Sequence, residues 1–260
     1  MLLSEKAGCE VKAVSLRYSN RIEAGALGGE PARLLRPALE VFLAGGKDRR
    51  AVLLPLFFGP GKALSGEAAA CAAELGRQFP EASLVVANCL VDPAESDTRI
   101  AEALADGVRK TIRGKKLIRP GVVLVDHGSP ERAVTAVRDH LGRQLERLLG
   151  DEAAPVTVAS MERRPGERHA FNEPLLENLL RRRNFWREDV VVALQFLSPG
   201  RHAGPDGDIA RICAEACREG TGLRMHLTEP LANDPQVVSV LADRYFRALG
   251  RPDQASFLGS

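Results

Sequence analysis

The sequence predicts an α/β protein made of two repeated units, each a parallel sheet covered by helices. Short β-like runs alternate with helix-like segments along the chain, which is the pattern of parallel sheets. The pattern restarts after a basic connector at residues 113–120, and the two halves resemble one another in detail. We therefore predict an N-terminal domain at residues 1–116 and a C-terminal domain at residues 117–260.

Each predicted strand is a short, mostly apolar, β-like run, and each predicted helix is a longer segment between two such runs. In the first half the expected strands cover residues 11–16, 51–58 and 83–90, and the expected helices cover 31–45, 65–78 and 97–112. In the second half the expected strands begin at residues 122, 156, 190 and 223, and the expected helices cover 131–149, 173–183, 206–219 and 235–249.

The repeat indicates that the first half is incomplete. RPALEVFLAGG matches EPLLENLLRRR, and LLPLFFGPGKA matches ALQFLSPGRHA. Aligning VKAVSLRYS with VTVASMERR implies that the first half begins at its second strand and lacks its opening strand and most of the helix that follows. A sheet that lacks a strand exposes unpaired backbone groups. We expect either the N-terminal segment or a partner chain to cover this sheet. The protein would then be a monomer in the first case and a homodimer in the second.

Composition narrows the class of protein. The chain has 260 residues, of which 45% are hydrophobic, and a net charge of +2. This is enough for a substantial core and too mild a charge to favour nucleic acid as a partner. The five cysteines include no C-x-x-C pair, which favours a reducing, cytoplasmic location. No apolar stretch approaches the roughly 20 residues that span a membrane.

Three apolar runs in the second half each end at a residue that can bind a metal or move a proton. VVLVDHGSP contains His127, VTVASMERR contains Glu162, and VVVALQFLSPGRH ends at His202. Parallel strands place such residues together in the crevice at their carboxyl ends. Imidazole and carboxylate suit a borderline divalent metal, and histidine titrates near neutral pH. We predict that these three residues form a catalytic and metal-binding site, whereas the first half has Ala63 opposite His202.

Arginines flank this predicted site. Arg163 and Arg164 follow Glu162, and Arg201 precedes His202. Guanidinium groups pair well with carboxylates, so these three side chains could hold a polyacidic substrate. A serine hydrolase is disfavoured, because no G-x-S-x-G elbow is present. A dinucleotide-binding fold is disfavoured as well, because no G-x-G-x-x-G follows a strand.

The motifs resemble those of the class II tetrapyrrole chelatases, specifically the CbiX-type sirohydrochlorin chelatases of cobalamin and siroheme biosynthesis. The resemblance rests on DHGSP, on ASMERR followed by FNEPLLE, and above all on FLSPGRHAGPDGDI. It implies two flavodoxin-like units, paired histidines at His127 and His202, and an acidic residue at Glu162. It also implies insertion of cobalt or iron into sirohydrochlorin, whose carboxylates the three arginines would meet. The divalent metal is then a substrate, and no organic cofactor is required.

Two other functions stay open at this point. The incomplete first half is compatible with a non-catalytic homologue that binds metal or tetrapyrrole. The same ligands could also activate a water in a metal-dependent hydrolase, which would retain its metal tightly. The residues do not distinguish cobalt from iron or separate the roles of the two histidines.

Overall fold

The structure, a computed structural model, describes residues 2–16, 24–27, 29, 31–46, 49–182, 188–219 and 222–250. Contacts between residues divide the chain into two compact units. Unit 1 comprises Met1–Leu90 with Val238–Ser260, and unit 2 comprises Val91–Val237.

Unit 2 is built on a four-stranded parallel sheet in the order β4-β3-β5-β6. The strands are β3 (Gly121–Asp126), β4 (Val156–Ser160), β5 (Asp189–Leu194) and β6 (Arg224–Leu227). All six residues of the central strand β3 are buried, which explains why it is a continuous apolar run instead of an alternating one.

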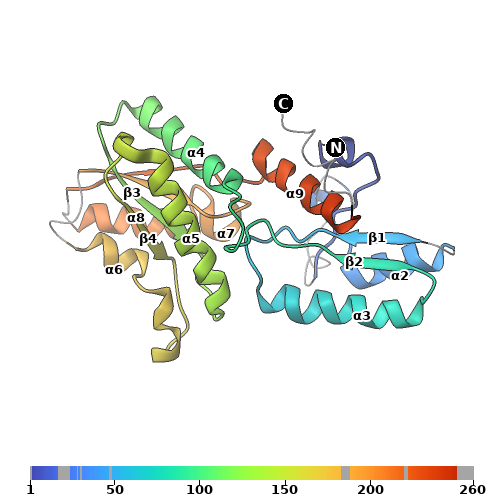
Figure 1. Cartoon of the computed structure of the whole chain (residues 1–260). Coiled ribbons are helices and arrows are strands. Elements are labelled where there is room, and N and C mark those ends of the chain that lie inside the picture. Colours follow the sequence, from blue (N-terminus) through green and yellow to red (C-terminus); the bar gives the residue numbers. More distant parts are fainter. Residues whose placement is uncertain are drawn as a thin grey trace. The chain divides into compact units, whose positions relative to one another are not determined.

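Helices cover both faces of this sheet (Figure 1). On one face, α4 (Arg99–Lys115) and α5 (Arg132–Leu149) pack against each other and against β5 and β4. On the other face, α6 (Leu176–Leu180) and α8 (Asp208–Arg218) enclose a core with alternate residues of the strands, such as Val123, Val125 and Val192. The short helix α7 (Gly200–Ala203) lies between β5 and α8 along the chain.

The strand order creates a switch point between β3 and β5. After β3 the chain crosses through α5 to β4 on one side, and after β5 it crosses through α8 to β6 on the other side. The two connections therefore leave neighbouring strands in opposite directions. Open α/β sheets form their ligand crevices at such a point, beyond the carboxyl ends of the strands.

Unit 1 has a two-stranded parallel sheet, β1 (Arg50–Leu53) with β2 (Ser83–Val86). Helices α2 (Leu35–Ala44) and α3 (Ala69–Gln78) bury a leucine-rich core with it. Helix α9 (Pro235–Ala248) lies beside the segment after β2, where Arg244 Nε donates to the Cys89 carbonyl. The remaining elements are short: α1 (Leu2–Ala7), a 3-10 turn (Ala24–Leu27) and a π-helical turn (Ala63–Ala68) before α3.

The prediction of parallel α/β sheets is confirmed, but the strand predicted at residues 11–16 is wrong. In this segment Ser15 forms only an isolated parallel bridge with Leu34. The physical reason is that a strand needs a neighbouring strand to form a ladder. Among the described residues, the sheet of unit 1 contains only β1 and β2, and they pair with each other. The helix predicted at 173–183 is also shorter, Leu176–Leu180, and residue 183 lies outside the described residues.

The division by contacts differs from the predicted boundary at residues 116 and 117. Helix α4 belongs to unit 2 because it packs against α5 and β5. Most of α9 belongs to unit 1, where Arg244 reaches the end of the segment after β2. Each half of the sequence thus gives a helix to the unit formed mainly by the other half.

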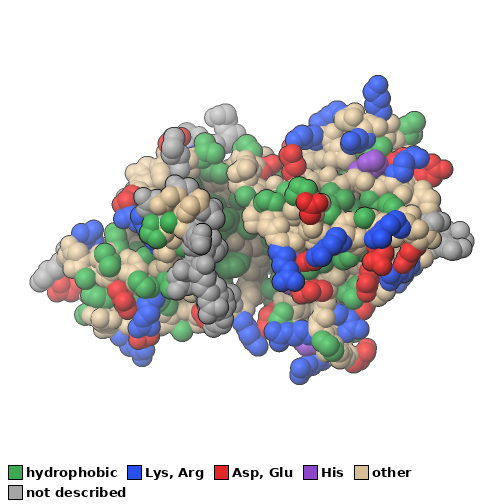
Figure 2. All heavy atoms as spheres, turned by 180° about the vertical axis from the view of Figure 1, so that it is seen from behind, with side chains coloured by type: hydrophobic (Ala, Val, Ile, Leu, Met, Phe, Trp, Pro, Cys, Tyr) green, Lys and Arg blue, Asp and Glu red, His purple; other side chains and the backbone are tan. Residues whose placement is uncertain are grey.

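The apolar content of the helices and the charges on the surface match the expectations from the composition. None of the helices among the described residues is both long enough and apolar enough to cross a membrane. On the face shown in Figure 2, basic and acidic side chains are interspersed, without one continuous basic patch.

Asp189 gives the amino end of the unit 2 sheet a pH-dependent contribution to stability. Arg224 on β6 donates to both carboxylate oxygens, at 2.9 and 2.6 Å, and His226 Nε2 lies 2.9 Å from Oδ1. The hydrogen bonds from Arg224 lower the pKa of Asp189 to about 2. A carboxyl with a lowered pKa stabilises the fold above its unfolded pKa of about 3.9 and loses that contribution as the pH falls.

We expect Asp189→Asn to have a lower free energy of unfolding than the parent at pH 5, measured by urea unfolding. This difference in free energy should shrink towards pH 2. A difference that stays constant over this range would contradict the assignment.

Candidate active site

The structure brings the three sequence-predicted site residues together in unit 2. His127 directly follows β3, Glu162 follows β4 by two residues, and His202 lies in α7 after β5. The imidazole rings of His127 and His202 meet edge to face, with centroids 4.7 Å apart and planes at 72°. His127 Nε2 lies 3.6 Å from Glu162 Oε1. The group therefore sits at the switch point between β3 and β5.

Backbone pairing of β3 with β4 continues past both strands and carries two of these side chains. Met161 N donates to Asp126 O at 2.8 Å, and Glu162 N donates to His127 O at 3.2 Å. Because the ladder reaches residues 127 and 162, the imidazole and the carboxylate are held side by side by main-chain geometry. On the other side, Gln195 N donates to Val125 O and ties β5 to the same strand end.

Gly128 makes this close approach possible. Its φ is +89°, a conformation that residues with a side chain rarely adopt. A Cβ at this position would overlap the carbonyl oxygen of Glu162. Glycine is therefore required here both by its own backbone conformation and by the neighbouring chain.

Asn172 holds the loop that follows His127. Its side-chain oxygen accepts from Ser129 N at 2.9 Å and from Thr135 Oγ1 at 3.1 Å. Its amide nitrogen donates to the carbonyl oxygens of Ser129 and His169. All of its side-chain hydrogen-bonding capacity is thus used inside the protein, with the side chain fully buried.

A buried arginine links this loop to the strand ends. Arg138 Nη1 donates to Ser160 Oγ at 2.7 Å and to the Asn172 carbonyl at 2.9 Å. Ser160 Oγ donates in turn to Asp126 Oδ1 at 2.6 Å. Burial raises the pKa of Asp126, and the bond from Ser160 opposes that rise. These side chains hold together the ends of β3 and β4, directly before His127.

His202 has a carboxylate partner of its own. Its Nδ1 lies 2.6 Å from Asp208 Oδ2, at the first residue of α8. The loop between them is tightly wound, since a Cβ on Gly207 would lie 2.5 Å from the His202 carbonyl oxygen. The hydrogen bond from His202, with help from Arg211, lowers the pKa of Asp208.

The remaining histidines have other surroundings. His169 is buried, its Nε2 accepts from Arg168, and burial lowers its pKa. Burial likewise lowers the pKa of His140, and His226 pairs with Asp189. Within the described ranges, no cluster of three or more His, Cys, Asp or Glu side chains is already arranged to hold a metal ion. His127, His202 and Glu162 are brought together, but their donor atoms are not gathered around one point.

A sequence model of the CbiX family matches residues 121–248. These residues form a CbiX-family domain. The resemblance inferred from the motifs is thereby confirmed, and the match contains His127, Glu162 and His202. A search of curated proteins finds no significant match.

Solved structures share the fold of this chain at low sequence identity. SirB from Bacillus subtilis with Fe³⁺ aligns with a TM-score of 0.66 and 13% identity, over 95% of this chain and 86% of SirB. The sirohydrochlorin chelatase SirB from B. subtilis subspecies spizizenii in complex with cobalt gives 0.61 and 12%, over 88% and 86%. A multi-domain protein from Deinococcus radiodurans, described as similar to chelatases, gives 0.55 and 14%, over 88% and 49%.

The three predicted arginines of the CbiX domain differ in their surroundings. Arg163 Nε donates to Glu173 Oε1 at 2.7 Å, and its Nη1 donates to the Gly166 carbonyl, so its guanidinium is used within the protein. Arg164 is exposed. The side chain of Arg201 is 82% exposed, and its Nε lies 3.8 Å from Asp208 Oδ2. Arg164 and Arg201 are thus the two of the three that are exposed.

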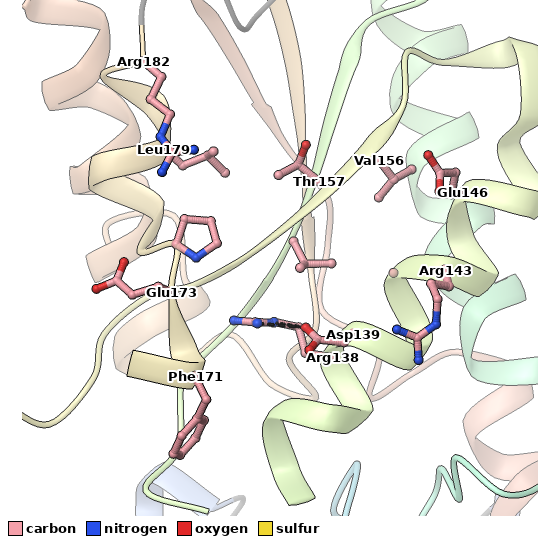
Figure 3. Close-up of a pocket in the computed structure, with 13 residues that line it drawn as sticks. Arg138, Asp139, Arg143, Glu146, Val156, Thr157, Phe171, Glu173, Leu179 and Arg182 are labelled. Carbon is pink, nitrogen blue, oxygen red and sulfur yellow. Dashed lines mark hydrogen bonds and ion pairs between the residues drawn. The ribbon is translucent and has the colours of Figure 1, made fainter. Parts of the chain in front are cut away.

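The CbiX domain also has a pocket of about 540 Å³ beside the edge strand β4 (Figure 3). It is lined by Val156 and Thr157 of that strand and by Arg138, Phe171 and Glu173 across from it. The three candidate site residues do not line it. Figure 3 shows the Arg138 guanidinium joined to Asp139, so this buried cation is already neutralised. We therefore keep this pocket apart from the histidine site.

Sequence reasoning missed four residues that position the site. Asn172 and Asp208 lie inside FNEPLLE and FLSPGRHAGPDGDI, two of the segments that carried the family resemblance. Ser160 lies inside ASMERR, a third such segment, and Arg138 lies within a helix and carries no local signal. Their partners are 22 to 34 residues away along the chain, so only the fold reveals them.

Gly128→Ala tests whether the close approach of the two loops is required. Gly166 is the matched control, because its φ is +99° but a Cβ there has open space around it. Gly166→Ala should lower the free energy of unfolding by about 1–3 kcal/mol from backbone strain alone. Gly128→Ala should lower it further, because the new methyl group also overlaps the Glu162 carbonyl. Urea unfolding of both variants measures the difference. Equal losses would show that the approach at Gly128 is not tight.

Proposed function

We propose that this protein inserts a divalent metal ion, cobalt or iron, into sirohydrochlorin. The observation that carries the proposal is the meeting of His127 and His202, 4.7 Å apart, beside Glu162 in a CbiX-family domain. The fold is shared with SirB structures that are described as holding Fe³⁺ and cobalt. The ligand types present accept either metal, so both belong to the proposal.

The chemistry of insertion matches these side chains. The free macrocycle gives up two pyrrole N–H protons as the divalent metal enters, and the metal exchanges water for pyrrole nitrogens. Neutral imidazole can receive the metal or accept a proton near neutral pH. We assign these tasks to His127 and His202, with Glu162 orienting His127 or relaying a proton. The metal is a substrate that leaves with the product.

We further propose that residues 1–116 and 117–260 are duplicated units, the first of them incomplete. Two similar bridges support this proposal. Ser15 forms an isolated parallel bridge with Leu34 directly before α2, and Ser160 forms one with Leu175 directly before α6. Ser15 and Ser160 are paired in the alignment of VKAVSLRYS with VTVASMERR. Their bridge partners are not, because RPALEVFLAGG matched to EPLLENLLRRR pairs Leu175 with Ala38.

Light scattering of the purified protein would decide between the monomer and the homodimer that an incomplete first half allows.

Removing either imidazole should stop catalysed insertion. We expect His127→Ala and His202→Ala each to lower the rate of cobalt insertion by at least about 100-fold, the usual contribution of a positioned proton acceptor. The assay is anaerobic absorbance spectroscopy of sirohydrochlorin with Co²⁺ or Fe²⁺. His226→Gln is the matched control, because its imidazole pairs with Asp189 at the other end of the sheet.

The same assay without protein gives the spontaneous rate. Parent protein that does not exceed this rate, although folded, would overturn the proposal and favour a protein that binds metal or tetrapyrrole without turnover. Full activity in either alanine variant would remove that histidine from the site.

The exposed arginines should contribute to tetrapyrrole affinity. Replacing Arg164 or Arg201 by Gln should raise the KM for sirohydrochlorin about 2- to 5-fold each, with kcat little changed, since an exposed ion pair contributes up to about 1 kcal/mol. Arg163→Gln should instead lower the free energy of unfolding, because Arg163 binds Glu173. The effects on KM should weaken at high salt. An unchanged KM in the Arg164 and Arg201 variants would show that neither guanidinium meets the substrate.

A further inference from the structure

Asp208 contacts His202 at Nδ1, the ring nitrogen to which the proposed function assigns no chemical task. Its Oδ2 lies 2.6 Å from His202 Nδ1, and its other oxygen accepts from Arg211 Nη2, one turn along α8. Arg201 Nε lies 3.8 Å from Oδ2. The side chains of Asp208 and His202 are 23% and 32% exposed. The pair is thus partly shielded from water, and Arg211 binds the carboxylate oxygen of Asp208 that His202 does not use.

This contact decides where the proton sits on neutral His202. An ionised carboxylate can only accept hydrogen bonds, so Nδ1 must carry the proton and Nε2 must keep its lone pair. His127 reaches the same state by another route, since its Nδ1 lies 3.0 Å from the carbonyl oxygen of Gly128, which also only accepts. Histidines that bind metals typically donate their second N–H to a carboxylate or a backbone carbonyl. Both arrangements are present here on neighbouring rings.

We infer that Asp208 is a positioning residue that holds His202 in the Nδ1–H tautomer, so that Nε2 can take the metal or a pyrrole proton. The role of Nε2 rests on the proposed function. The tautomer itself follows from the contacts of His202 and Asp208 alone. On His127 the acceptor is a main-chain group, so His202 is the ring whose tautomer a side-chain substitution can change.

Arg211 fixes how an asparagine at position 208 would be oriented, so Asp208→Asn tests more than the loss of a charge. Its guanidinium only donates hydrogen bonds. In Asp208→Asn the side-chain oxygen is therefore held by Arg211, and the amide NH₂ is left facing His202 Nδ1. That NH₂ needs an acceptor, which Nδ1 becomes when the proton moves to Nε2. Asparagine in place of a histidine-orienting aspartate is known to favour the wrong tautomer in this way.

The first measurement is the ¹⁵N NMR spectrum of His202, recorded near pH 9, well above the ordinary histidine pKa of about 6.5. We expect Nδ1–H in the parent protein and Nε2–H in Asp208→Asn. In Asp208→Asn with Arg211→Met, the amide is free to turn, and its oxygen should again accept from Nδ1–H. Nε2–H in the parent, or no change of tautomer in Asp208→Asn, would overturn the inference. The parent spectrum alone decides if a variant does not fold.

The second measurement is cobalt insertion by the same proteins. Asp208→Asn should lower kcat/KM for Co²⁺ about 10- to 100-fold, the usual effect of losing such a partner, and Arg211→Met in the same chain should restore part of it. Asp206→Asn is the control, because Asp206 is exposed and nearby; its kcat/KM should not change. Equal activity of Asp208→Asn and Asp206→Asn would overturn the positioning role. The NMR measurement of the tautomer does not require turnover. A parent protein without chelatase activity would therefore refute the proposed function, while the NMR spectrum would still test the tautomer of His202.

Discussion

The candidate site depends on the pairing of β3 with β4 beyond the ends of both strands. The bond from Glu162 N to His127 O sets the imidazole and the carboxylate side by side, and Gly128 lets the two chains approach. The bond from Gln195 N to Val125 O holds β5 against the same strand, which brings the His202 segment to the other side of His127. The side chains that support this region, Asn172 and Arg138, are buried.

In both histidines Nδ1 lies beside a hydrogen-bond acceptor. The acceptor is a backbone carbonyl for His127 and a carboxylate for His202, so we infer that Nε2 is the nitrogen that acts in each ring. Under the proposed function the metal leaves with the product, and a few well-oriented donors suit this better than a closed cage, because open coordination positions let the next ligand enter. Exposed Arg164 and Arg201 add positive charge beside these donors.

Much of this arrangement could be predicted from the sequence, because it follows from where apolar runs end. His127 and His202 were predicted from the strand ends that carry them, and Glu162 from the strand between them along the chain. The sequence failed where a residue depends on a distant partner. Residues 11–16 have the composition of a strand, but a ladder also needs a neighbour. The sequence also does not show that Glu173, ten residues later, binds the guanidinium of Arg163. Asp208 and Asn172 lay in quoted motifs, and only the folded chain shows what they contact.

The proposed function requires that the metal ion passes through the site formed by His127 and His202. Anomalous diffraction from a crystal soaked with Co²⁺ tests this requirement most directly. We predict a cobalt peak within about 2.0–2.3 Å of Nε2 of His127, of His202 or of both, the distance range of nitrogen ligation. Cobalt bound only to other residues, in a protein that still catalyses insertion, would contradict the proposal.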